Sequence, residues 1–101
     1  MTRLRLDPEV RKENIIQSAL AVSRKDGITR VTRKTVAEHA GIAEGLVSHY
    51  YNTMNQLRRD VARRAMADED PTILAMMLSD PKLKKRLEPR HKEIAISHLK
   101  G

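Results

Sequence analysis

Apolar residues recur at helical spacing over most of this chain, and the stretches that carry them are bounded by capping residues, glycines and prolines. The first stretch has an apolar face made by Ile15, Ile16, Ala19, Leu20 and Val22. It follows Asp7, whose side chain can accept from the free amides of a first helical turn, and Pro8, which fits the first helical position. Gly27 is a typical helix stop. We therefore expect a helix over about residues 8–25.

Two shorter helices are expected on either side of a glycine turn. Thr32 is a suitable N-cap for the first of them, and its inward residues would be Val36, Ala37 and Ala40. Gly41 closes the turn, because glycine adopts backbone conformations that a side chain would penalise. Ile42 is expected to bury in the angle between the helices, and the second helix to run over about residues 44–51. This layout is that of a helix-turn-helix.

A fourth helix and a short C-terminal region complete an all-α small helical bundle. Thr53 can cap a helix whose inward stripe fades near residue 67 and holds Met54, Leu57, Val61 and Ala65. The acidic residues before Pro71 mark a boundary, so we divide the chain into residues 1–67 and an extension over residues 68–101. Two short helices are expected there, one over the apolar residues 73–78 and one over residues 82–87. The segment after Pro89 fits a basic tail, a partner strand or a last helix.

Charge points most directly to a partner. The 101 residues include 20 Lys and Arg against 13 Asp and Glu, a net charge of +7. The excess lies in residues 1–67, which carry 13 basic and 7 acidic side chains. Such a surface favours nucleic acid, an acidic protein or an anionic membrane. No apolar run is long enough to span a bilayer and no signal-peptide core is present, so we expect a cytoplasmic, nucleoid-associated protein without membrane contact.

The candidate chemistry lies at the starts of the second and third helices. Arg33 and Lys34 fall in the first turn of the second helix, where cations oppose the helix dipole by a few tenths of a kcal/mol each. They are either phosphate ligands or a tolerated surface pair. Gly45 costs roughly 1 kcal/mol against Ala in a helix, which is understandable where the backbone must approach a partner, or in a frayed first turn. Ser48 and His49 are short polar side chains that can reach base edges.

The adjacent tyrosines should differ in environment. We expect Tyr51 to pack inward and Tyr50 to be more exposed, where its hydroxyl could donate to a phosphate.

Other chemistries find little support in the sequence. Four histidines occur, but none has a second ligand at metal-binding spacing, and the chain has no cysteine. Ser48 and His49 cannot form a catalytic pair, because adjacent residues of a helix point about 100° apart. There is no glycine-rich phosphate loop. We therefore expect no enzyme activity, no metal and no cofactor.

A longer series of residues follows a recognisable order and spacing: Ile15-Ile16, Ala19-Leu20, Gly27, Val31-Thr32, Val36-Ala37, Ala40-Gly41-Ile42, Gly45, His49-Tyr50-Tyr51 and Leu57. Across residues 9–66 this series resembles the N-terminal DNA-binding domain of TetR-family transcriptional regulators. The resemblance implies that Thr32 and Arg33 contact phosphate. It also implies that the residues on or near the major groove are Glu44, Gly45, Leu46, Ser48, His49 and Tyr50.

Three residues depart from the family pattern. Ala43 stands where the family usually has a serine cap, and Ser48 where a tyrosine is frequent. Met54 stands where a phosphate-gripping lysine is usual, so backbone affinity should be weaker. The residues that could compensate are Asn52, Thr53, Asn55 and Arg58.

Family members are usually much longer and have a C-terminal domain that dimerises and holds an inducer pocket. Residues 68–101 are too few to enclose such a pocket, so we expect no small-molecule inducer. A minimal phage or mobile-element regulator, or a truncated relative, would fit. We expect a homodimer, whose candidate interface is Ile73, Leu74, Met76, Met77 and Leu78. The alternative is that these residues cap the domain's own core.

The sequence thus predicts a regulator, most simply a repressor, that binds double-stranded DNA at a near-palindromic operator as a dimer. The alternative is a small basic helical module that inhibits or adapts a host protein and reuses the helix-turn-helix scaffold.

Overall fold

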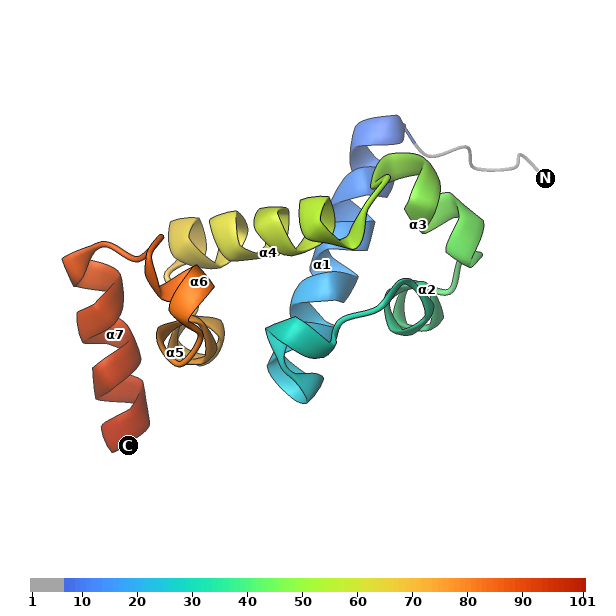
Figure 1. The fold of residues 1–101 in the computed structure, drawn as a ribbon. Coiled ribbons are helices and arrows are strands. Elements are labelled where there is room, and N and C mark those ends of the chain that lie inside the picture. Colours follow the sequence, from blue (N-terminus) through green and yellow to red (C-terminus); the bar gives the residue numbers. More distant parts are fainter. Residues whose placement is uncertain (1–6) are drawn as a thin grey trace.

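In the computed structural model, residues 7–101 are described, and they form helices joined by short loops (Figure 1). The elements in chain order are α1 (Pro8–Asp26), the 3-10 turn η1 (Ile28–Arg30), α2 (Arg33–Ala40), α3 (Glu44–Tyr50), α4 (Met54–Asp68), α5 (Pro71–Leu78), α6 (Pro81–Lys84) and α7 (Pro89–Lys100). No strand occurs among these residues, and the predicted all-α class with its helix-turn-helix is confirmed.

Most helix starts have the caps that the sequence predicts. The side chains of Asp7, Thr32 and Thr53 accept hydrogen bonds from the first turns of α1, α2 and α4. Asp70 and Asp80 do the same for α5 and α6. Proline occupies the first position of α1, α5, α6 and α7, where its missing N–H leaves no hydrogen bond unmade. These local signals set the helix boundaries.

The structure differs from expectation at two places in the C-terminal region. α6 is shorter than the expected helix over residues 82–87 and ends at Lys84. The segment after residue 88 is a helix, so of the three alternatives for it the last one holds. Its inward residues are His91 and Ala95, which pack toward α5.

A single apolar core runs through the chain and does not break at residue 67. It includes Ile15 and Leu20 of α1, Val61 of α4 and Leu74 of α5. An ion pair from Arg24 Nε to Asp70 Oδ2, over 2.7 Å, further ties α1 to the start of α5. α5 is therefore an integral part of the fold.

The burial of α5 corrects our interface prediction. Ile73, Leu74 and Met77 are fully buried against the chain's own core, so these three side chains are not available as a contact surface. Met76 and Leu78 are half-buried and pack against the same core. The alternative, in which this segment caps the domain's own core, describes the structure.

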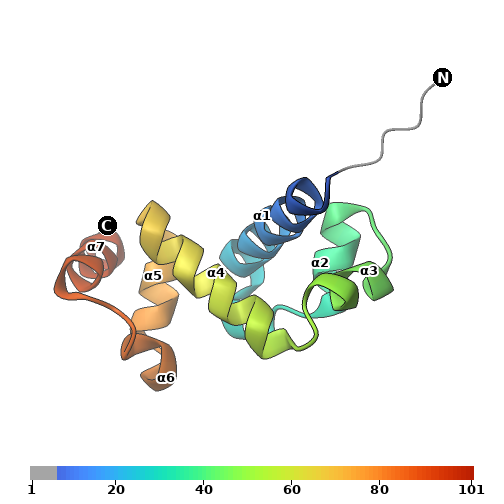
Figure 2. The same ribbon diagram turned by 90° about the horizontal axis from the view of Figure 1, so that it is seen from above.

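The helices are arranged along an elongated molecule, with extents of 50, 24 and 20 Å. α2 and α3 lie at one end and α7 at the other, while α4 runs between them (Figure 2). None of the helices over residues 7–101 is both long and apolar enough to cross a membrane.

Candidate nucleic-acid interface

The start of α2 is fixed by a reciprocal pair of threonine hydrogen bonds. The Thr35 backbone N–H donates to Thr32 Oγ1, and the Thr32 backbone N–H donates to Thr35 Oγ1, each over 3.1 Å. This capping box satisfies two backbone donors at once and sets the direction of the first turn. Lys34 is exposed there, and Arg33 is half-buried.

Arg33 joins the start of α2 to the loop that precedes α4. Its Nη2 donates to the carbonyl oxygen of Asn52 over 2.8 Å. The next residue, Thr53, caps α4 by accepting from the Gln56 N–H over 3.2 Å. The structure therefore brings together two predicted groups of site residues that are far apart in the sequence. It also gives Arg33 a structural contact that the sequence did not predict.

α3 presents one face to solvent and buries the other. Val47 is fully buried. Of the predicted groove residues, those that are exposed are Glu44, Gly45 and His49, and those that are half-buried are Leu46, Ser48 and Tyr50. Ala43 occupies the N-cap and makes no side-chain hydrogen bond, so the first-turn amides of α3 have no side-chain acceptor. The exposed face is therefore short and centred on the first turn and His49.

Packing within the chain does not require Gly45. A Cβ atom at this position would meet nothing within 4 Å, and the residue lies in ordinary helical backbone. A glycine there costs roughly 1 kcal/mol relative to alanine. The described residues thus leave open space at this position, which would admit a partner close to the helix backbone.

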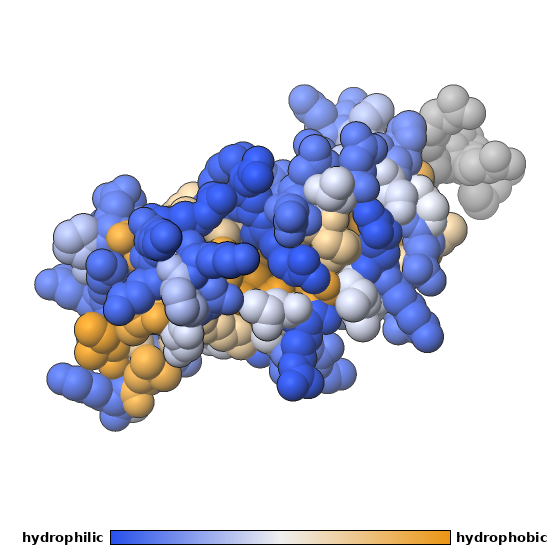
Figure 3. Space-filling model, viewed as in Figure 1, coloured by the Kyte–Doolittle hydropathy of each residue, from blue (hydrophilic) through white to orange (hydrophobic). Residues whose placement is uncertain are grey.

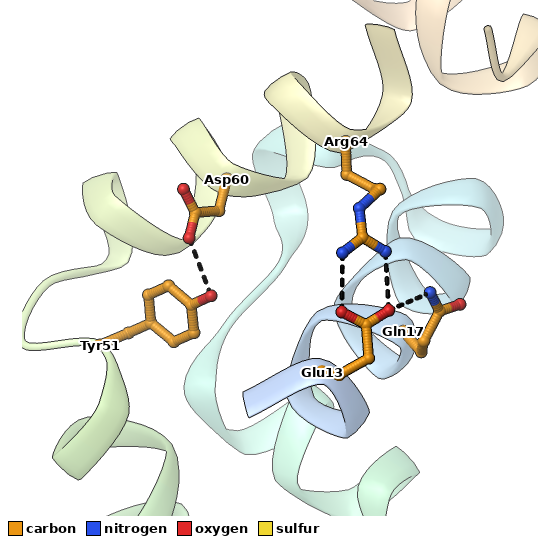
Figure 4. A network of polar contacts seen from close by, with 5 residues as sticks. All are labelled: Glu13, Gln17, Tyr51, Asp60 and Arg64. Carbon is orange, nitrogen blue, oxygen red and sulfur yellow. Dashed lines mark hydrogen bonds and ion pairs between the residues drawn. The ribbon is translucent and has the colours of Figure 1, made fainter. Parts of the chain in front are cut away.

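Tyr51 anchors the end of α3 to α4, and Tyr50 lies nearer the surface, as predicted. Tyr51 is 3% exposed, and its hydroxyl donates to Asp60 Oδ2 over 2.9 Å (Figure 4). Burial, together with the hydrogen bond to Asp60, raises the pKa of Tyr51 well above its ordinary value. The Lys12 ammonium lies 5.1 Å from the centroid of this ring. The Tyr50 ring instead meets that of His49 edge to face, with centroids 5.1 Å apart.

A charged brace joins α1 to α4. Arg64 donates through both terminal nitrogens to the two carboxylate oxygens of Glu13, each over 2.7 Å (Figure 4). Gln17 Nε2 donates to the same carboxylate over 2.9 Å. The hydrogen bonds from Arg64 and then from Gln17 lower the pKa of Glu13 to about 2. Two residues 51 positions apart thus hold α4 against α1, the helix on which α2 packs.

The residues that could compensate for the lysine missing at Met54 differ in their surroundings. Arg58 Nη2 donates to the Val31 carbonyl oxygen over 3.0 Å, so this guanidinium is held beside the start of α2. Met54 is half-buried and packs against the core. Asn52, Thr53 and Asn55 are exposed. Of the four residues that could compensate for the missing lysine, these three are the exposed ones.

The sequence reading also missed a cationic surface at α6. Its basic residues are exposed: Lys82, Lys84, Lys85 and Arg86. A signal was present, because four of the five residues over 82–86 are basic. The near balance of 7 basic and 6 acidic residues over 68–101 concealed it.

Comparisons with known proteins agree with this geometry. Residues 15–61 match the family of "Bacterial regulatory proteins, tetR family", a range that contains all of α2, α3 and the turn between them. The HTH-type transcriptional regulator BetI of Proteus mirabilis is 32% identical over 82 residues, which cover 78% of this chain and 40% of that protein. The HTH-type transcriptional regulator BetI 2 of Chromohalobacter salexigens is 27% identical over 85 residues, covering 70% and 41%. The chain thus spans about two fifths of the length of these relatives.

Proposed function

Residues 15–61 of this chain belong to the tetR family of bacterial regulatory proteins, and from that premise we propose that the protein is a DNA-binding regulator of transcription. The observation that carries the proposal is the exposed face of α3, where Glu44, Gly45 and His49 lie free of the core on a helix that packs against α2. A helix of this kind fits the major groove, which is wide enough to admit it.

The residues would divide the work between positioning and reading. Thr32 and Lys34 at the start of α2 and Thr53 at the start of α4 would contact phosphates, which set the register on the duplex. His49 and Ser48 would reach base edges, and Gly45 would let the backbone of α3 come close. Arg33 would contribute charge to the same surface while it holds Asn52 in place.

We further propose that the protein acts as a dimer on a near-palindromic operator and represses by occluding a promoter. Two recognition helices one helical turn apart, about 34 Å, read such a site. The exposed apolar residues of α7 support a contact between copies: Ile96 is 44% exposed and Leu99 is 62% exposed. In Figure 3 apolar residues gather at the α7 end of the molecule. We propose that this face takes the place of the α5 interface predicted from sequence.

The first experiment is to incubate the pure protein with fragmented genomic DNA of its source at moderate salt and to sequence what it retains. Enrichment of one near-palindromic sequence would support a dimeric sequence-specific regulator. Retention without a shared sequence would contradict specific reading by α3. No retention would contradict DNA binding altogether and favour the protein-binding alternative, whose acidic partner a pull-down would then seek.

A further inference from the structure

A basic groove lies between the first half of α4 and α6, outside the surface formed by α2 and α3. It encloses about 490 Å³. The side chains that matter for its chemistry are Asn55, Arg58, Arg59, Asp80, Lys82 and Arg86. Four of these six are cationic and one is acidic. Hydrophilic residues cover this part of the molecule, in contrast to the end of α7 (Figure 3).

The cations of the groove form no salt bridge with any acidic residue in the described part of the chain. The five salt bridges among residues 7–101 involve none of Arg58, Arg59, Lys82 or Arg86. Asp80 is occupied otherwise, because its Oδ1 accepts from the backbone N–H groups of Lys82 and Leu83 over 2.9 and 3.2 Å. The carboxylate therefore serves as the cap of α6, and the groove keeps an excess of positive charge.

The groove is continuous with the candidate interface. Arg58 lies on its wall and also donates to the carbonyl of Val31, the residue before the Thr32 cap of α2. Asn55 lies in the first turn of α4, two residues after the exposed Thr53. A DNA backbone that passes the starts of α2 and α4 would therefore reach the groove next.

We infer that this groove binds the DNA backbone beside the segment that α3 reads, so that α6 extends the interface past the helix-turn-helix. The ligand is a phosphate of the duplex, recognised by charge and without base contacts. This inference rests on the proposed function. It assigns to Lys82 and Arg86 a role that would lengthen the contacted DNA without changing the sequence preference.

The test compares two double variants of α6 that lose the same charge. Lys82→Gln with Arg86→Gln removes two groove cations, and Lys84→Gln with Lys85→Gln removes two neighbouring cations that do not line the groove. Each protein is titrated against two duplexes by fluorescence anisotropy. One is trimmed to the sequence that the wild type enriches, and the other has about one further helical turn on either side.

The groove variant should make the plot of log affinity against log salt less steep, by about 2 per bound protomer on the longer duplex, and it should lose the preference for that duplex. Sequence preference should be unchanged, and the control variant should resemble the wild type. Equal behaviour of the two variants, or wild-type binding that does not depend on duplex length, would overturn the inference and direct attention to an acidic protein partner. A wild type that binds neither duplex would instead overturn the proposed function itself. Thermal unfolding of each variant checks that the fold is intact.

Discussion

The two ends of the molecule share one apolar core and differ in the polar contacts that are added to it. Around α2 and α3 the contacts that set geometry are polar and join residues far apart in the sequence, as from Arg33 to Asn52 and from Glu13 to Arg64. At the other end α7 packs on α5 chiefly through buried side chains such as Leu74 and Ala95. Directional hydrogen bonds fix orientation, whereas apolar packing supplies stability with less demand on geometry.

This difference follows what each end presents to solvent. A surface that reads DNA needs its donors at fixed positions, since base recognition depends on hydrogen-bond geometry. The α7 end presents exposed apolar side chains, Ile96 and Leu99, for which a fixed direction matters less.

The largest effect should come from Leu74→Ala in α5, whose side chain is fully buried in the continuous core. We expect the free energy of unfolding to fall by about 2–5 kcal/mol, in a single transition for the whole chain. Urea unfolding followed by circular dichroism measures it, with Leu57→Ala in α4, also fully buried, as the matched variant. If only part of the helical signal melted early in Leu74→Ala, the division at residue 67 into separate domains would be right and the single core would not.

His49→Ala should leave stability nearly unchanged, because this side chain is exposed on α3. Binding to the enriched sequence should weaken by about 1–3 kcal/mol and discrimination at one base position should relax. Anisotropy titrations with the enriched duplex and with single-base variants measure both. Unchanged binding to the enriched duplex would show that α3 is not the reading helix.

Arg33→Ala should lower both the stability of the protein and its affinity for DNA. The lost hydrogen bond to Asn52 should lower the free energy of unfolding by about 0.5–1.5 kcal/mol. Binding should weaken alike for all DNA sequences, and the salt dependence should become less steep by about 1 per bound protomer. Lys34→Ala is the control, because this exposed neighbour should reduce the salt slope without changing stability. Equal stability of the two variants would show that the Arg33–Asn52 contact does not support the fold.

The smallest effect concerns pH. The pKa of Glu13 is about 2, below the ordinary value of 4.5, because Arg64 and Gln17 donate hydrogen bonds to its carboxylate. The stabilisation is therefore present above about pH 4.5 and is lost as the pH falls toward 2. Because the pair is partly exposed, we expect no more than about 1 kcal/mol.

The measurement is the urea midpoint as a function of pH for the wild type, Glu13→Gln and the surface control Glu9→Gln. The wild type and Glu9→Gln should lose this increment below pH 4.5, and Glu13→Gln should lack it throughout. If the urea midpoint declined equally with pH in all three proteins, Glu13 would not contribute to the loss of stability in acid.

Much of the fold could be predicted because its signals are local. The caps at Asp7, Thr32 and Thr53 act within one helical turn, so the residues themselves identify the helix starts. α7 was ambiguous for a specific reason. Its inward residue His91 is polar, and only the structure shows that it is 2% exposed and that its Nδ1 accepts from the Glu88 N–H. A buried histidine interrupts the apolar period from which a helix is predicted.

The site shows the same limit. The residue types and spacing around Gly41 identified α2, α3 and the exposed face with His49, because those features belong to neighbouring residues. The partners of Arg33 and Arg58 are backbone carbonyls 19 and 27 positions away. Because every residue has a backbone carbonyl, the sequence does not identify which one accepts the hydrogen bond. The interface predicted on α5 meets a related limit, because Ile73, Leu74 and Met77 are buried in the chain's own core. An apolar run indicates burial, but it does not tell which surface covers it.

The prolines that open α5, α6 and α7 have a mechanical consequence. A continuous rod from α4 to the end of the chain would place all three inside a helix, at about 3 kcal/mol or more each. Neighbouring helices in this region therefore cannot join into one longer helix, and the molecule cannot change shape in that way. Any movement of the C-terminal end has to be a rotation at the joints between helices, and the first joint, at Glu69 and Asp70, is clasped by Arg24.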